Sequence, residues 1–443
     1  MERKTGKAAR NSRREFLASS GAIAAGMYLA APAIAGAAGV ETLAINGGRK
    51  AVTASASGAT SWPLFGDEER EAVNAVVSSP GYGEVQAFED AWQEHFKPPY
   101  CKSHMNGTSA LASALFGLNL PPGSEILVPS LDPWFGILPM RFLDLVPVFV
   151  DNHPRTLNFD LEDAKRRLTK NTRAIEVVHL FGLPCDMEAI CDFAKEKGLL
   201  VLEDCAHAHN ASINGKYVGN WGQIGAFSCQ GSKVLPAIEG GIANYENREY
   251  YERAATFGHY ECPGKFPSDS KYRKYGATGL GLKLRIHPMG AALARCQLKK
   301  LDQQTEMERE QAHSLNSRLC QLPGIYEQAP APGVKRVYWS RNQLFIDPEK
   351  CGMSRDVVVK TLKAEGVAIG NLNYSVSHRD PAFTEAQWWH HPPVIPDRLP
   401  GLEEALRTGV SLPRFTKPVP ELIDQYVAAF EKVWAHRTAL GKG

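Results

Sequence analysis

Leu199-Leu200-Val201-Leu202-Glu203-Asp204 is the stretch that decides the fold, and the polar turn Ser228-Cys229-Gln230-Gly231-Ser232-Lys233 follows it. Four apolar residues in a row that end in two acids predict a buried strand of an α/β sheet. Ligands of open α/β sheets bind at the carboxyl ends of the strands, so Asp204 lies where chemistry is expected. Lys233 adds an amine a short distance further along the chain.

Asp204 and Lys233 are the residue types that pyridoxal phosphate requires. A lysine holds this cofactor as a Schiff base, and an acid under the pyridine nitrogen keeps that nitrogen protonated and the ring an electron sink. The alternative is that Asp204 caps the next segment and Lys233 is a solvated loop residue, since both types are common at surfaces. The two residues alone leave both interpretations open.

Further motifs surround this pair in a fixed order. They read Glu203-Asp204-Cys205-Ala206-His207-Ala208-His209, then Gly215-Lys216-Tyr217-Val218-Gly219, then Phe227-Ser228 through Lys233, and then Glu239-Gly240-Gly241. The succession resembles the sugar and cyclitol aminotransferases of the DegT/DnrJ/EryC1/StrS family, which carry E-D-x-A-x-A-H, G-K-x-V-G, F-S-x-x-x-x-K and E-G-G. Several linked motifs are far more specific than any single one.

The resemblance implies a role for each matching residue. Lys233 falls on the Schiff-base lysine, Asp204 on the partner of the ring nitrogen, and Ser228 on a contact to the cofactor phosphate. His207 falls where the family usually has glutamine, near the phenolic oxygen of the cofactor. A histidine can form that hydrogen bond with a charge that depends on pH. The alternative for His207 is a buried, satisfied core histidine.

Asn106-Gly107-Thr108-Ser109-Ala110-Leu111 opens a predicted helix. Small polar residues at a helix N-terminus leave backbone N–H groups free to bind an anion. The family has G-T-S-A here to hold the cofactor phosphate, so the resemblance gives Thr108 and Ser109 this role. Plain N-capping would use the same atoms.

Two segments depart from the family pattern. The family has P-S-x-T followed directly by an aromatic that stacks on the cofactor, whereas Pro129-Ser130-Leu131-Asp132-Pro133-Trp134 has its aromatic one position later. We expect Trp134 to stack on the cofactor ring; otherwise it is ordinary core. Lys283 and Arg285 lie where the family has G-x-N-x-R, which reaches the neighbouring subunit's site in its dimers. Lys283 would meet the cofactor phosphate and Arg285 a substrate carboxylate, or both form surface ion pairs.

Strands and helices alternate before Asp204 as in parallel α/β folds. Strands are predicted at 125–128, 146–150, 174–180 and 199–203, and helices at 86–96, 134–143, 161–168 and 187–197. With the resemblance, this predicts pyridoxal-phosphate transferase fold type I, the aspartate-aminotransferase type: a large, mixed, mostly parallel sheet domain at 59–287. One long helix at 288–322 and a smaller α+β domain follow to residue 443.

The start of the chain indicates export. Ser12-Arg13-Arg14-Glu15-Phe16-Leu17 precedes an Ala- and Gly-rich stretch without charge, typical of a twin-arginine signal. We expect residues 1–35 to be a cleaved leader, 36–58 to be a linker, and the protein to be periplasmic. If the leader stays, it is the only expected membrane contact.

The charge and the cysteine spacing give no indication of a nucleic-acid binder or a metal site. A formal charge of +2 and 22% charged residues, without a basic stripe, do not indicate a nucleic-acid binder. The nine cysteines are scattered and form no C-x-x-C pair, so no metal site is predicted.

The predicted function is a pyridoxal-phosphate-dependent aminotransferase. By family resemblance it is a homodimer that moves an amino group from glutamate or glutamine to a keto-sugar or ketocyclitol by ping-pong transamination. The alternative is an exported binding or sensor protein that keeps the fold without turnover, which the shifted aromatic, His207 and Lys283 would allow.

Overall fold

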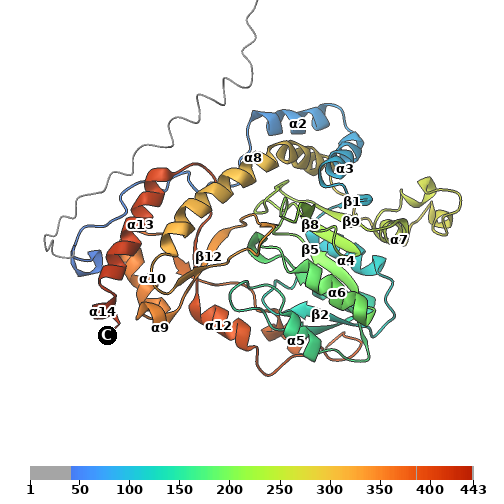
Figure 1. The fold of residues 1–443 in the computed structure, drawn as a ribbon. Coiled ribbons are helices and arrows are strands. Elements are labelled where there is room, and N and C mark those ends of the chain that lie inside the picture. The colour runs from blue at the N-terminus through green and yellow to red at the C-terminus, as the bar shows by residue number, and fades with distance from the viewer. Residues whose placement is uncertain (1–40, 386, 442–443) are drawn as a thin grey trace, which may run out of the picture. The chain divides into compact units, whose positions relative to one another are not determined.

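A seven-stranded sheet lies at the centre of the part that carries the predicted site (Figure 1). The computed structural model describes residues 41–385 and 387–441, so the predicted leader at 1–35 lies outside the described residues. The strand order is β1-β9-β8-β5-β4-β2-β3, and only the pairs of β9 are antiparallel. The strands are β1 (Tyr100–His104), β2 (Glu125–Pro129), β3 (Val146–Val150), β4 (Thr172–Val178), β5 (Leu200–Asp204), β8 (Ile224–Ser228) and β9 (Gly241–Tyr245).

Helices cover both faces of this sheet (Figure 1). Along β5, Leu202 packs in the apolar cluster on the face of α4, whereas Val201 packs in the cluster on the face of α6. Successive side chains of a strand point to opposite faces, and the apolar run therefore fills both layers. The helices here are α3 (Gly83–Phe96), α4 (Gly107–Gly117), α5 (Leu161–Arg166), α6 (Met187–Lys197) and α7 (Arg248–Gly258). The fold is that of the predicted type I class.

A second, antiparallel sheet lies in the C-terminal part, in the order β10-β12-β14-β13. Its strands are β10 (Ile325–Glu327), β12 (Arg341–Ile346), β13 (Gly370–Asn371) and β14 (Gly409–Pro413). Its helices are α9 (Pro348–Cys351), α10 (Arg355–Ala364), α11 (Pro381–Thr384), α12 (Pro400–Thr408), α13 (Pro420–Ala435) and α14 (Arg437–Leu440). The long helix α8 (Pro288–Leu319) packs on α3, on α2 (Asp67–Ser78) and on α13, so it joins the two parts.

The third sheet has three short strands. Its order is β11 (Val334–Lys335), β6 (Ser212–Ile213) and β7 (Lys216–Tyr217). The residues from 41 to 58, for which a linker is expected, begin with a single 3₁₀ turn at Ala44–Asn46. Leu43 and Val52 are buried in the core of the C-terminal part, so this segment packs on that part.

The loop after β2 differs from its prediction. In place of a helix over 134–143, residues 134–137 form a turn and Leu138–Leu143 a 3₁₀ helix. Gly136 approaches the carboxyl of Glu176 so closely that a Cβ there would lie 2.3 Å from Oε1. Pro139 has no N–H for a helical bond. Packing against β4 therefore overrides the helical pattern.

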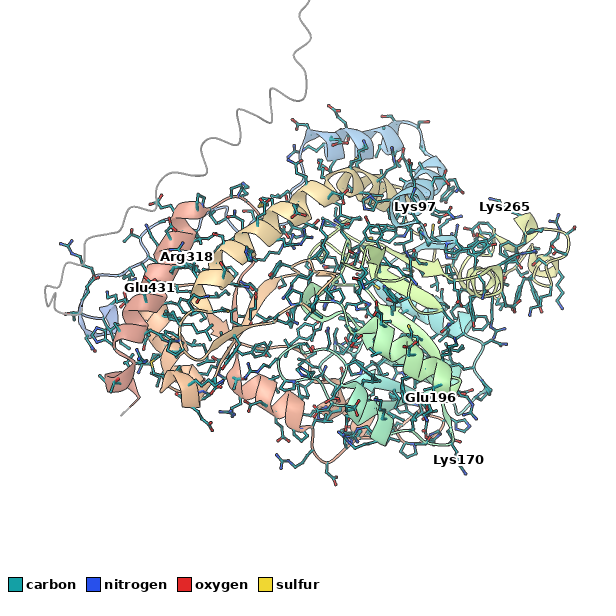
Figure 2. All side chains as sticks on the ribbon, in the orientation of Figure 1. Lys97, Lys170, Glu196, Lys265, Arg318 and Glu431 are labelled. Carbon is teal, nitrogen blue, oxygen red and sulfur yellow. The ribbon has the colours of Figure 1, made fainter. Side chains whose placement is uncertain are left out.

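The six charged side chains that are labelled in Figure 2 lie on the surface. Within the part of the chain that the structure describes, we find no helix that combines the length and apolar character of a membrane span.

Candidate active site

A cavity of about 470 Å³ opens at the carboxyl ends of β2, β5 and β8. Ligand pockets have volumes of this order. Its wall combines residues of the large sheet with Trp339 and Tyr374 of the C-terminal part. The polar and ionisable side chains in this wall include those of Asn106, Thr108, Asp132, Asp204, His207, Ser228, Gln230, Lys233, Glu239 and Tyr374. The structure thus brings Asp204 and Lys233 together at one cavity.

Asp204 ends β5 and is buried. Its Oδ1 accepts a hydrogen bond of 2.8 Å from the backbone N–H of Ala206. Burial raises the pKa of Asp204, whereas the Ala206 N–H and the Lys233 ammonium oppose this rise because they favour the carboxylate. Ala206 itself lines the cavity beside the carboxyl group.

Lys233 lies in a turn that two tryptophans hold. The indole N–H of Trp62 donates to the Lys233 carbonyl at 2.9 Å, and the indole N–H of Trp339 donates to the Ser232 carbonyl at 2.9 Å. The Lys233 Nζ lies 4.3 Å from the centre of the Trp339 ring. Burial lowers the pKa of Lys233 to about 8, against the opposing charge of Asp204. An amine with such a pKa can act as a nucleophile and a base near neutral pH.

His207 forms one wall of the cavity and stacks on Trp339, with ring centroids 3.6 Å apart and planes at 9°. Its Nε2 lies 3.2 Å from the Tyr374 hydroxyl. The buried Nδ1 has no hydrogen-bond partner among the described residues. Burial lowers the pKa of His207 well below its usual value, so the imidazole is neutral and can bond an oxygen of a bound ligand.

The N-terminus of α4 and Ser228 lie together on the cavity wall. Asn106 caps the helix and accepts a 2.8 Å bond from the Ser109 N–H, whereas the N–H groups of Gly107 and Thr108 have no intrahelical acceptor. A Cβ on Gly107 would lie 2.6 Å from the Cβ of Ser228, so only glycine allows this approach. Helix N–H groups and a hydroxyl at one point suit a phosphate.

These residues fit pyridoxal phosphate. The helix terminus would hold the phosphate, Lys233 the carbonyl carbon and Asp204 the ring nitrogen, and an unpartnered His207 nitrogen is present for the phenolic oxygen. All of these groups face one cavity, although they come from segments far apart in the sequence.

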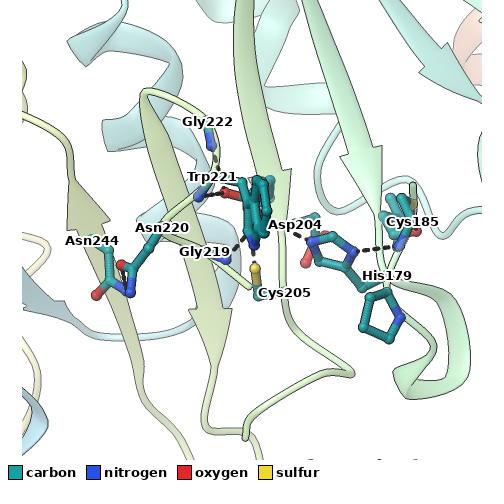
Figure 3. Close-up of polar contacts among 12 residues, drawn as sticks. His179, Cys185, Asp204, Cys205, Gly219, Asn220, Trp221, Gly222 and Asn244 are labelled. Atoms are coloured by element: carbon teal, nitrogen blue, oxygen red, sulfur yellow. Dashed lines mark hydrogen bonds and ion pairs between the residues drawn. The ribbon is translucent and has the colours of Figure 1, made fainter. Parts of the chain in front are cut away.

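A buried network behind Asp204 fixes the end of β5 (Figure 3). The Glu203 carboxylate accepts from the N–H groups of Gly219, Trp221 and Gly222 at 2.7–2.8 Å and pairs with His179 Nε2 at 3.1 Å. His179 Nδ1 accepts from the Cys185 N–H at 3.0 Å. Although His179, Glu203 and Cys205 lie close enough to suggest a metal site, their polar atoms are already bonded within the protein. The cluster is therefore a hydrogen-bond network that positions Asp204.

Four predicted residues lie outside the cavity wall. Ser109 is buried in the first turn of α4, and Trp134 is half-exposed with its ring 4.1 Å from that of Phe135, which does line the cavity. Arg285 pairs with Glu261 at 3.3 Å and stacks on Tyr82, and Lys283 is exposed. Thr108, His207 and Ser228 join Lys233 and Asp204 at the cavity.

Sequence reasoning missed Asp132, Phe135, Trp339 and Tyr374. A signal was present for Asp132, because it lies three residues after β2, a buried strand whose carboxyl end lies at the same edge of the sheet as that of β5. Trp339 and Tyr374 had none, since they come from another part of the chain.

Comparisons with known proteins agree on one group. A model of the DegT/DnrJ/EryC1/StrS aminotransferase family matches residues 64–431. The chain is 31% identical over 281 residues to GDP-perosamine synthase of Escherichia coli O157:H7, and the matched region covers 62% of this chain and 75% of that protein. It is 33% identical over 295 residues to L-glutamine:scyllo-inosose aminotransferase of Streptomyces griseus, covering 63% and 69% respectively.

A solved structure of similar fold is that of an aminotransferase from Psychrobacter cryohalolentis. The TM-score is 0.76 at 25% sequence identity, and the match covers 85% of this chain and 99% of that chain.

Proposed function

Because the chain belongs to the DegT/DnrJ/EryC1/StrS aminotransferase family, and is thus a pyridoxal-phosphate-dependent aminotransferase, we propose that it moves an amino group from glutamate or glutamine to a keto-sugar or ketocyclitol. The exchange would be ping-pong, with the donor leaving before the acceptor enters. The observation that carries the proposal is that Lys233 and Asp204 face one cavity with a phosphate site on its wall. The substrates in the names of the two relatives support the choice of acceptor and donor.

The bound cofactor supplies an electron sink for the pair of electrons left when the donor loses its α-proton. The Lys233 Nζ would take that proton and return one to the acceptor carbon, which its lowered pKa favours. Asp204 would hold a proton on the ring nitrogen opposite, and the N–H groups at the start of α4, with Ser228, would hold the phosphate. Trp339 would cover Lys233 and exclude water from it.

We further propose that the protein is exported as a folded chain by its twin-arginine leader, and that it is a homodimer. Arg13, Arg14 and the uncharged stretch after them support export. The exposed Lys283, and Arg285 outside the cavity of its own chain, support a dimer in which this segment reaches the partner's site. Loss of export of a folded reporter after Arg13→Lys with Arg14→Lys would test the leader, and light scattering would test the dimer.

The experiment for the activity uses purified protein loaded with pyridoxal phosphate. We expect a visible absorption band that glutamate or glutamine bleaches and a keto-sugar or ketocyclitol restores. Lys233→Ala should lack this band, although it still folds. A band that no amine bleaches would contradict the aminotransferase proposal and favour a binding protein. Restoration by simple 2-keto acids alone would contradict the proposed acceptor class.

A further inference from the structure

Asp132 places a second buried carboxyl group on the wall of the active-site cavity. It lies three residues after the end of β2 and is only 1% exposed. Neither of its carboxyl oxygens has a hydrogen-bond partner among the described residues. A buried polar group without a partner is expensive, so its presence calls for a ligand or a proton.

The loop that carries Asp132 is fixed by its backbone. The Leu131 N–H donates to Asn152 Oδ1 at 2.8 Å, and the Ser130 N–H donates to the Val150 carbonyl at 3.1 Å. The hydroxyl of Ser377 donates to the carbonyl of Asp132. Since the end of β3 and the C-terminal part both hold this loop, the position of the Asp132 carboxyl group on the cavity wall is fixed.

The charges around Asp132 do not balance if every acid is ionised. Asp204 and Glu176 are the acids that face it from β5 and β4, Lys233 is the cation on its turn, and Tyr374 and the neutral His207 close the wall. One ammonium cannot neutralise three buried carboxylates. Neighbouring carboxyls in this situation share protons, and the less supported ones stay neutral.

The hydrogen bonds decide which acid is ionised. Asp204 has the Ala206 N–H as a donor, whereas residues 41–385 and 387–441 supply no hydrogen-bond partner to any carboxyl oxygen of Asp132 or Glu176. Burial raises the pKa of Asp132 well above its usual value, and the charge of Asp204 adds to the rise. Burial and Asp204 likewise raise the pKa of Glu176 to about 8. Among these four groups, Lys233 is then a cation, Asp204 an anion, and Asp132 and Glu176 neutral acids.

We propose that Asp132 is the protonated acid of the active site, and that it donates a hydrogen bond to an oxygen of the acceptor substrate. Of the three acids Asp132, Glu176 and Asp204, only Asp204 remains a carboxylate. The part that concerns the acceptor rests on the proposed function, because a keto-sugar or ketocyclitol offers ketone and hydroxyl oxygens. The protonation of Asp132 does not depend on that function.

The first test is an infrared difference spectrum of the parent holoenzyme against Asp132→Asn, near pH 7. We expect the parent to show the C=O stretch of a protonated carboxyl group that shifts in D₂O and is lost in the variant. Glu176→Gln should retain this band, because Glu176 is a separate group that does not line the cavity. Carboxylate bands at Asp132 in place of the C=O stretch would overturn the proposal.

The second test compares the KM for the acceptor with the KM for the amino donor. Asp132→Leu keeps the size and removes the donor, and it should raise KM for the acceptor about 10-fold, the usual effect of one hydrogen bond. The KM for the amino donor should rise less than about 2-fold by the same reasoning. Asp132→Asn keeps an N–H donor and should raise the acceptor KM less than leucine does. An equal rise for both substrates, or a larger rise with asparagine, would overturn the assignment to the acceptor. The infrared result stands even if no acceptor of the proposed class is turned over.

Discussion

Burial of Lys233 predicts that its amine is reactive near neutral pH before any cofactor binds. Its pKa of about 8 compares with 10.5 for an ordinary lysine. The two values differ by about 2.5, so near pH 7 about a tenth of the Lys233 side chains are neutral, against about 0.03% in the unfolded chain. The neutral fraction is thus about 300-fold larger in the folded protein.

The assay is pulsed acetylation of the apo-protein from pH 6 to 11, followed by digestion and mass spectrometry of the peptide that contains Lys233. Limited access to the cavity lowers the plateau rate but leaves the midpoint in place, so the midpoint reports the pKa. We expect half-maximal labelling near pH 8, and near the ordinary lysine value for the same peptide in denaturant.

Asp204→Asn sharpens this test. Asp204 favours the charged form of Lys233, so its removal should move the midpoint further below about 8. A midpoint near 10 in the parent, or a rise of the midpoint in Asp204→Asn, would refute the reasoning that burial governs the lysine.

Three other perturbations follow from the structure. Gly107→Ala should weaken pyridoxal phosphate binding at least about 10-fold in an absorbance titration, because the added Cβ would push α4 away from Ser228. Gly83→Ala is the matched control: its Cβ would have no described atom within 4 Å, so this variant should bind the cofactor as the parent does. Glu203→Ala should lower the free energy of unfolding in urea by about 3–5 kcal/mol, since it strands the buried N–H donors and His179; a loss below about 1 kcal/mol would mean that the network is not tight. Burial lowers the pKa of His104 and His209 to about 3, so as pH falls below 6.5 the unfolded chain binds protons at these positions that the folded chain does not, and each histidine should lower stability by about 1.4 kcal/mol per pH unit. Asp132 and Glu176, whose pKa values are raised, act in the opposite direction in the same range, so the test compares the parent with His209→Gln. The urea midpoint of the variant should fall less steeply between pH 6.5 and 5, and equal slopes would contradict the assignment.

The core of the site could be predicted because its signals are local. An apolar run that ends in Glu203-Asp204 forms a central strand wherever it occurs in an α/β fold, and strand ends meet at one edge. The cap at Asn106 follows from its side chain and the small residues after it. These features depend on neighbours in the sequence, and the structure places them as expected.

Other features depend on contacts between distant segments. The stretch 134–143 has the composition of a helix, but the approach of Gly136 to Glu176 on β4 imposes a turn. As a result Phe135 faces the cavity, whereas Trp134 was expected there. Trp339 and Tyr374 reach the site only through the packing of the two sheets, for which no single stretch carries a signal.

The two tryptophans that hold the lysine turn set the order in which the protein can mature. Trp62 lies 171 positions before Lys233, and it is itself covered by the Arg414 guanidinium, 4.0 Å above its ring. The turn therefore takes its final form only after nearly the whole chain has been synthesised and packed. A nascent chain that stalls before residue 414 accordingly has Lys233 without the packing that shapes its turn and without the burial that lowers its pKa.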